Sequence, residues 1–138
     1  MTSANYAIVK KFISLCNAGD LDEAFSLLSE DSKWGITQRV RGVLMPKQDL
    51  MTRMRAMRTA FKDPLQLTPI SVIEQGNRLA VECESFAITL EGKTYENKYC
   101  VFFTVENDKI TAVNEYNDSL HVVQVLIPAM EYVRSLKQ

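Results

Sequence analysis

The sequence is poor in the side chains that bind metals and form disulfides, with one histidine and three cysteines among 138 residues. Cys16, Cys83 and Cys100 are odd in number and lack C-x-x-C spacing, which indicates neither a disulfide framework nor a zinc site. His121 lies just past a predicted strand end, where a lone histidine is more often a surface or capping residue than a catalyst. We therefore predict no metal site and a reducing, cytoplasmic environment.

Long apolar runs and an excess of charge of one sign are also missing. The 16 Lys and Arg residues balance 17 Asp and Glu residues, for a formal net charge of −1. Proteins that bind nucleic acid or anionic membranes by bulk electrostatics need a basic excess or a basic stripe. No segment approaches the roughly 18 apolar residues of a membrane span, and the first residues lack a secretory signal. We expect no nucleic-acid partner, no membrane partner and no export.

The sequence does contain enough apolar residues, 46% of the chain, to form one core and a single domain over residues 1–138. Residues 6–18 carry apolar side chains at the three- and four-residue spacing of one helical face. A second, short helix follows Asp20, and a third is predicted over residues 46–62. The methionines of this third helix are interpreted as core and its arginines as a solvated face.

Beyond Pro64 the period of the apolar residues changes from 3.6 to 2. Short segments rich in turn-forming residues separate four such runs, which predicts an antiparallel meander. Helices followed by strands predict an α+β domain with the helices packed on one face of a curved sheet. The runs are 68–74, 78–90, 93–106 and 109–118, with a further short strand expected over 33–40 and helix on either side of Pro128.

Several short motifs carry a resemblance to a known family. They are VKKF at 9–12 and NAGDLD at 17–22 near the start, then GKTYENKY at 92–99, FFTV at 102–105 and EYND at 115–118. With these motifs the chain resembles the NTF2-like superfamily, in particular SnoaL-type polyketide cyclases and ketosteroid isomerases. The resemblance implies a cystatin-like, NTF2-like cone, in which a bent sheet wraps a long first helix around an apolar pocket. It also implies a homodimer formed through the outer face of the sheet.

Only some of the catalytic residues of characterised relatives have chemically similar residues at the corresponding positions of this sequence. The tyrosine and aspartate of ketosteroid isomerases correspond to Phe12 and Ile36, which can neither hold nor move a proton, so steroid isomerisation is disfavoured. The triad of limonene-epoxide hydrolases, an arginine flanked by two aspartates, corresponds to Glu82, Glu84 and Glu115. The arginine and the water-positioning pair of those enzymes are absent from the corresponding positions.

These three glutamates are the candidate catalytic residues. Period-2 geometry places Glu82, Glu84 and Phe86 on one face of their strand. If that face lines the pocket, carboxylates crowded into an apolar cleft cannot all ionise. Glu84 would then be the general base, Glu115 its acid partner, and Glu82 would tune the pair. The residues expected to orient the substrate are Asn97, Tyr99 and Asn117, and those expected to wall it are Trp34, Phe86 and Val113.

The opposite orientation of the same strand remains open. Alternating polar residues on a sheet usually face water, which would place Glu82 and Glu84 outside and Val81, Cys83 and Ser85 inside. The resemblance favours the inward orientation. A cluster of carboxylates in the pocket would select a neutral or cationic ligand over a phosphorylated one.

Two functional hypotheses from different classes follow. One is an SnoaL-like protein that performs acid/base chemistry without a cofactor, of the isomerase, cyclase, lyase or hydrolase type, on a small apolar molecule that bears an oxygen. The other is a non-catalytic module of the same fold that binds a small ligand or serves dimerisation. Whether the chain is an enzyme at all is left open by its residues.

Overall fold

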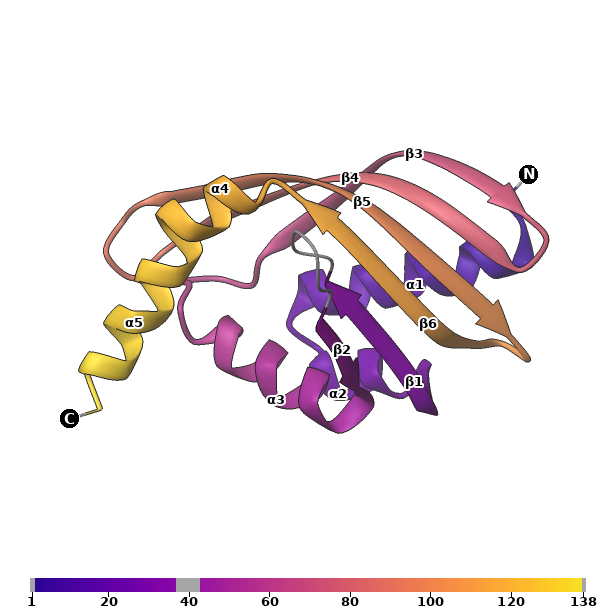
Figure 1. Cartoon of the computed structure of the whole chain (residues 1–138), viewed down its shortest axis with the longest axis horizontal. Coiled ribbons are helices and arrows are strands. Elements are labelled where there is room, and N and C mark those ends of the chain that lie inside the picture. The colour runs from indigo at the N-terminus through magenta and orange to yellow at the C-terminus, as the bar shows by residue number, and fades with distance from the viewer. Residues whose placement is uncertain (1, 37–42, 138) are drawn as a thin grey trace.

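The computed structural model of the chain describes residues 2–36 and 43–137, which form helices around one six-stranded sheet (Figure 1). Three helices precede most of the sheet and a helical tail follows it. The helical elements are α1 (Ala4–Ala18), α2 (Leu21–Phe25), α3 (Lys47–Arg58), α4 (Ser119–His121), the π-helical turn η1 (Val122–Leu126) and α5 (Ile127–Ser135). The strands are β1 (Leu28–Ile36), β2 (Val43–Pro46), β3 (Gln66–Gln75), β4 (Arg78–Ile88), β5 (Thr94–Glu106) and β6 (Lys109–Asn117).

The sheet has the strand order β2-β1-β6-β5-β4-β3, and β3 to β6 form the predicted antiparallel meander. β1 returns to pair parallel with β6, and β2 pairs antiparallel with the outer edge of β1. Asn107 and Asp108, which connect β5 to β6, both have positive φ, at 51° and 61°. Two successive left-handed residues match the twist of a tight hairpin, which explains why turn-forming residues stand there. The predicted α+β architecture is confirmed.

Several predicted boundaries differ from the structure, among them the start of the first strand, which is Leu28 rather than residue 33. The third helix begins at Lys47 and ends at Arg58, and Pro46 is its N-cap residue. β2 was not predicted, because its four residues are too few to show a period and its pairing to β1 is a tertiary contact. Residues 37–40 of the strand predicted over 33–40 lie outside the described residues.

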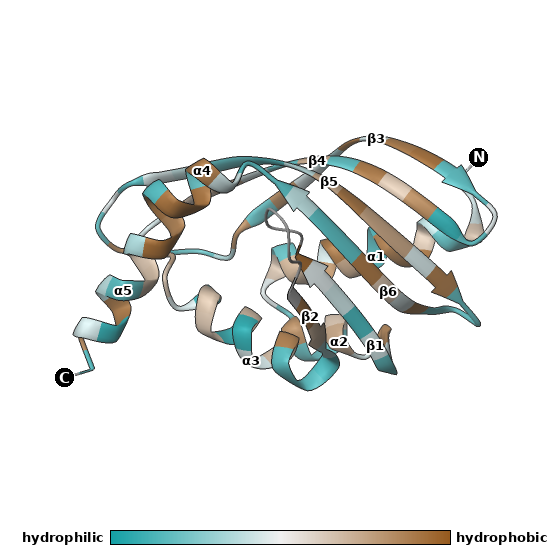
Figure 2. Ribbon diagram, viewed as in Figure 1, coloured by the Kyte–Doolittle hydropathy of each residue, from teal (hydrophilic) through white to brown (hydrophobic). Residues whose placement is uncertain are grey.

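The main core lies between α1 and the concave face of the sheet. Val9, Phe12 and Ile13 of α1 are buried against inward-facing strand residues such as Val101 and Phe103. Figure 2 shows this apolar character along β5 and on the helix that follows β6. The curved sheet and α1 thus enclose the side of the molecule on which any internal pocket must lie.

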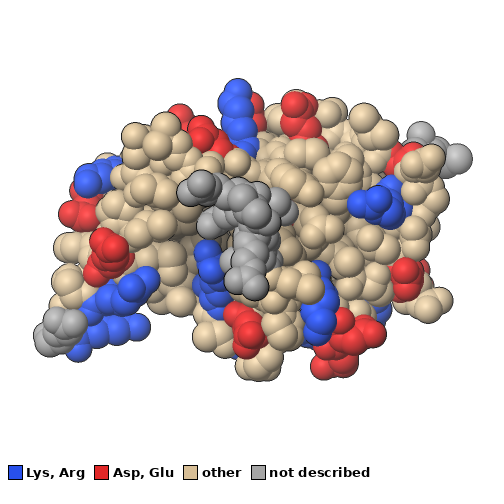
Figure 3. Space-filling model, viewed as in Figure 1, with Lys and Arg blue, Asp and Glu red and all other residues tan. Residues whose placement is uncertain are grey.

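The outer face of the sheet and the helices carry the charges. Figure 3 shows basic and acidic side chains interspersed over one face of the molecule, with no large area of a single sign. No helix within residues 2–36 and 43–137 combines the length and apolar composition that a membrane crossing requires.

The tail is helical on both sides of Pro128, as predicted, but it passes through a π-helical turn first. Proline has no N–H and its ring clashes with the carbonyl of the fourth residue before it, so a wider turn relieves the backbone there. Val122 and Leu126 of this turn are buried. α5 then extends away from the body of the molecule (Figure 1).

Candidate active site

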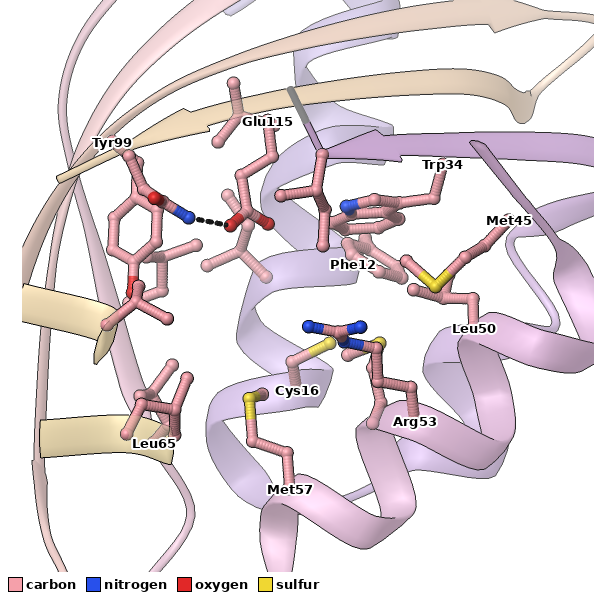
Figure 4. A pocket seen from close by; sticks show the side chains of 18 of the residues that line it. Phe12, Cys16, Trp34, Met45, Leu50, Arg53, Met57, Leu65, Tyr99 and Glu115 are labelled. Atoms are coloured by element: carbon pink, nitrogen blue, oxygen red, sulfur yellow. Dashed lines mark hydrogen bonds between the residues drawn. The ribbon is translucent and has the colours of Figure 1, made fainter. Parts of the chain in front are cut away.

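A cavity of about 150 Å³ lies between α1, α3 and the concave face of the sheet. Its walls are mostly aromatic, aliphatic and sulfur-containing side chains, which makes it a site for an apolar ligand. Figure 4 draws lining side chains contributed by both helices and by several strands, and labels ten of them. The polar or ionisable side chains among them are Cys16, Asn17, Trp34, Arg53, Tyr95, Tyr99, Glu115 and Asn117.

Glu115 on β6 is the only carboxylic acid among these described lining residues. Its partner across the parallel β1–β6 pair is Ile36, and Trp34 lies two residues earlier on the same face of β1. Asn117 Nδ2 donates a hydrogen bond of 2.8 Å to Glu115 Oε2, drawn as the dashed line in Figure 4. The Trp34 indole also interacts with the carboxyl group and acts to lower its pKa. Asn117 and Trp34 thus hold the carboxyl group in the wall of an apolar cavity.

Burial raises the pKa of Glu115 above its usual value of 4.5. The hydrogen bonds from Asn117 and Trp34 and the positive charge of Arg53 act in the opposite direction but do not overcome the loss of hydration. A carboxyl group with a raised pKa exchanges its proton closer to neutral pH. Such a group can serve as a general acid or a general base.

The thiol and phenol groups that line the cavity with Glu115 are held in their neutral forms. Burial raises the pKa of the Cys16 thiol to about 12, so this residue of α1 supplies no thiolate nucleophile near neutral pH. Burial also raises the pKa values of Tyr95 and Tyr99 on β5. Proton transfer within the cavity therefore falls to Glu115.

A buried network of hydroxyl and amide groups lies beside the cavity. Tyr99 Oη is 2.9 Å from Ser85 Oγ and 3.2 Å from Tyr95 Oη. Asn97 Nδ2 donates to Tyr95 Oη at 2.9 Å, and the Asn97 backbone N–H donates to Ser85 Oγ at 3.2 Å. The ring of Tyr95 is stacked on His121, with ring centroids 5.2 Å apart. This network fixes the direction in which the Tyr99 hydroxyl meets the cavity.

Four of the predicted site residues line the cavity together, namely Glu115, Asn117, Tyr99 and Trp34. Two others face inward but do not line it. Val113 is buried in the core, at 2% exposure, rather than in the cavity wall. Asn97 is 3% exposed, and its amide donates to Tyr95 Oη within the hydroxyl network.

The predicted acidic cluster does not form. Glu82, Glu84 and Phe86 lie on the outer face of β4, where Glu84 is paired with Lys98 at 3.7 Å. In an antiparallel pair, directly opposed residues share a face. The register opposes Ser85 to Asn97, so Ser85 shares the inner face and its neighbours Glu84 and Phe86 point outward. The alternative orientation, with Val81, Cys83 and Ser85 inside, is the correct one.

Arg53 is the cavity residue that the sequence interpretation missed. It was assigned to a solvated face, yet it lines the cavity together with Leu50, Met54 and Met57 of the same helix. The spacing of these four residues is that of one face of a helix, so the spacing itself was the signal. Figure 4 shows the Arg53 side chain reaching from α3 into the cavity, on the side where Glu115 lies.

Most of the chain matches a known protein family. A family model described as the SnoaL-like domain matches residues 9–113. The chain belongs to the SnoaL-like family. The match ends two residues before Glu115, so the candidate acid, Asn117 and the whole helical tail lie beyond the matched part of this SnoaL-like chain.

Solved structures share the SnoaL-like fold at low sequence identity. PrhC from Penicillium brasilianum is 16% identical, with 95% of this chain and 90% of that chain covered and a TM-score of 0.82. An NTF2-like protein from Burkholderia pseudomallei is 18% identical, with 91% and 98% covered and a TM-score of 0.78. A phenazine biosynthesis-related protein from Pseudomonas aeruginosa is 22% identical, with 89% and 80% covered and a TM-score of 0.74. No curated protein sequence is significantly similar to the chain.

The SnoaL-like cavity offers no cluster of metal ligands in the part of the chain that the structure describes. No three His, Cys, Asp or Glu side chains lie close enough there to hold a metal ion. The groups that can act on a ligand are thus Glu115 and the polar side chains around it.

Proposed function

We propose that this SnoaL-like protein is a cofactor-independent acid/base enzyme acting on a small, largely apolar molecule that bears an oxygen. The observation that carries the proposal is Glu115, a carboxyl group with a raised pKa that is held by Asn117 and Trp34 in an apolar cavity. Tyr99 and Trp34 bind the oxygen-bearing part of the substrate and the ring or chain beside it. Glu115 removes a proton from carbon and the same group returns it.

The presence of a single carboxyl group bears on the choice among isomerase, cyclase, lyase and hydrolase chemistry. Hydrolases that activate water with one carboxylate and protonate the leaving group with another need two acidic residues. Among the described lining residues only Glu115 is acidic. One group that first accepts and then donates a proton suits an isomerase or a cyclase, in which the substrate gains and loses no atoms. The structural neighbour related to phenazine biosynthesis places a similar fold in a biosynthetic setting.

The base function of Glu115 can be tested without knowledge of the substrate. The probe 5-nitrobenzisoxazole opens when a base removes its C3 proton: the electrons of the C–H bond form the nitrile, the N–O bond breaks, and a coloured cyanophenolate is released. We expect Glu115→Gln to lower the rate by about 100-fold or more. The matched control is Glu84→Gln on the outer face, which keeps the wild-type rate.

Two outcomes would contradict the enzyme proposal. A wild-type rate in Glu115→Gln would mean that another group is the base. No catalysis by the wild type, together with saturable binding of the probe, would favour the second candidate, a non-catalytic module that binds a small ligand. The loss of ionisable side chains at Phe12 and Ile36 supports this second candidate.

We also propose that the protein forms a homodimer through the outer face of the sheet. Support comes from exposed apolar side chains on this face, among them Ile73 at 74% and Tyr116 at 46% exposure. We expect sedimentation of the wild type to show a dimer at micromolar concentration and Ile73→Glu to weaken it. Val123→Glu, which changes an exposed apolar residue of η1, is the control. A stable monomer of the wild type would contradict this proposal.

A further inference from the structure

Arg53 is the only lysine or arginine among the described residues that line the cavity. Its side chain is exposed at the mouth, and its guanidinium points inward from α3 (Figure 4). Its neighbours along the helix face, Leu50, Met54 and Met57, are apolar. A cation thus stands at the entrance of a cavity whose walls are otherwise mostly apolar.

The charge of Arg53 is not used by an ion pair within the described residues. The ion pairs found there are Lys47–Glu30, Arg55–Asp22 and Lys98–Glu84. Residues 37–42 contain no Asp or Glu in the sequence. Arg55, two positions further along the same helix, is bound to Asp22 at 2.7 Å and lies over the ring of Phe25. Arg55 therefore has a structural role that Arg53 lacks.

The cavity carries a net positive charge when Glu115 holds its proton. Glu115 is the one acidic lining residue described, and burial favours its neutral form. Cys16, Tyr95 and Tyr99 also stay neutral because burial raises their pKa values. The guanidinium of Arg53 then has no counter-charge inside the cavity.

We infer that the cavity binds a small apolar carboxylate, with the carboxylate group paired to Arg53 and the apolar part packed against Phe12 and Trp34. The planar guanidinium donates two parallel N–H bonds that match the two oxygens of a carboxylate. A cavity of about 150 Å³ accommodates roughly one aromatic ring. This inference rests on the proposed function, since it takes the same cavity as the substrate site. It also replaces the expectation of a neutral or cationic ligand, which depended on the acidic cluster.

The chain offers a built-in reporter for the test. Trp34 is the only tryptophan of the sequence and it lines the cavity, so a nitroaromatic probe that enters will quench its fluorescence. The probes are 4-nitrobenzoate and 4-nitrobenzamide, which have nearly the same shape and differ in charge. We expect the wild type to bind the benzoate more tightly. Arg53→Gln should weaken binding of the benzoate by about five- to tenfold and change binding of the benzamide by less than about twofold.

Matched variants separate a local charge effect from a general one. Arg55→Gln removes the same charge from the same helix and should leave the affinity for both probes unchanged. Arg53→Lys keeps the charge but loses the paired donors, and should fall between the wild type and Arg53→Gln. Glu115→Gln should retain the preference for the benzoate, because it removes the one acidic lining residue described and leaves Arg53 in place.

The inference is overturned if the wild type binds the two probes equally well, or if Arg53→Gln weakens both to the same degree. Tighter, Arg53-dependent binding of 4-nitrophenyl phosphate than of the benzoate would assign the site to a phosphate instead. These results are independent of turnover. A protein without proton-transfer activity that still selects the benzoate through Arg53 would refute the enzyme proposal alone, whereas activity without this selection would refute the carboxylate site alone.

Discussion

Asn117 Nδ2 donates a hydrogen bond of 2.8 Å to Glu115 Oε2, and the two side chains share the inner face of β6 because they are two residues apart. This bond stabilises the ionised carboxylate and so opposes the effect of burial on the pKa of Glu115. The protonation of the cavity acid is therefore adjusted by a neighbour on its own strand.

Replacing Asn117 should change the pH at which Glu115 works as a base. Asn117→Ala removes a hydrogen bond that lowers the pKa of Glu115, so this pKa should rise further. The rate of 5-nitrobenzisoxazole opening should then reach half its maximum at a higher pH than in the wild type. Asn114→Ala, on the outer face of the same strand, is the control. An unchanged pH–rate profile in Asn117→Ala would show that the bond does not tune the acid.

Binding of 4-nitrobenzoate should weaken as the pH rises through the pKa of Glu115. The ionisable groups around this carboxyl group are Arg53 on α3, Cys16 on α1, and Tyr95 and Tyr99 on β5. Burial raises the pKa of Glu115 from its usual value of 4.5 towards neutral pH, and the ionised form of this group neutralises Arg53. Titration of Trp34 fluorescence at a series of pH values measures the effect. Glu115→Gln should give an affinity that does not vary with pH, and a variation that persists in this variant would assign it to another group.

Glu115→Gln should also stabilise the fold at neutral pH. The folded protein binds the Glu115 proton more tightly than the unfolded chain does, so the stability associated with this proton is complete below pH 4.5 and is lost as the pH rises through the folded-state pKa. The gain in the free energy of unfolding from this substitution should be smallest at acidic pH and should grow as the pH rises. It amounts to about 1.4 kcal/mol for each factor of ten by which the folded protein binds the Glu115 proton more tightly than the unfolded chain does. Urea unfolding between about pH 5 and 8 measures it. Glu84→Gln should give no gain that grows with pH. If the stability of Glu115→Gln varied with pH as that of the wild type does, the raised pKa of Glu115 would be contradicted.

Removing the Tyr95 hydroxyl should weaken the folded state without opening a cavity. Tyr95→Phe keeps the ring between Phe61 and His121 but deprives Asn97 Nδ2 of the nearer of its two acceptors, at 2.9 Å, and leaves one N–H of the amide unpaired. A buried donor left without its partner costs about 1–3 kcal/mol. Urea unfolding measures this loss against Tyr116→Phe, whose hydroxyl is on an exposed residue and whose change should stay within about 0.5 kcal/mol. Equal effects of the two substitutions would mean that the network adds no stability.

Local sequence patterns were sufficient for the order of elements and for the inward face of two strands. Alternation placed Tyr99 and Asn97 together on β5, and Glu115 and Asn117 together on β6, and all four side chains face inward. Alternation within one strand does not say which of its two faces meets the next strand. That choice depends on the register across the turn, and a shift of one residue moves every side chain to the other face. On β4 the polar side chains themselves favoured the outer face for Glu82 and Glu84, which is where the structure places them, and the inward prediction came from the family resemblance.

The missed residues depended on contacts between distant segments. β2 is defined by its pairing to β1, with Met45 opposite Trp34, and its own four residues carry no periodic signal. Arg53 shows the spacing of a cavity residue, but arginines on helices are usually solvated and its role depends on α3 facing β6 across the cavity. The charge of Arg53 therefore suggested a solvated position, whereas its spacing along the helix indicated a position in the cavity wall.

The π-helical turn gives the tail a share in the cavity, since Val122 and Leu126 form part of its wall while Glu115 and Asn117 stand on β6. One part of the cavity wall and the proton-transferring group thereby come from separate segments of the chain. Substitutions at Val122 or Leu126 change the shape of the cavity wall and leave the proton-transferring group in place. The choice of ligand can thus be altered through the tail without any change on β6.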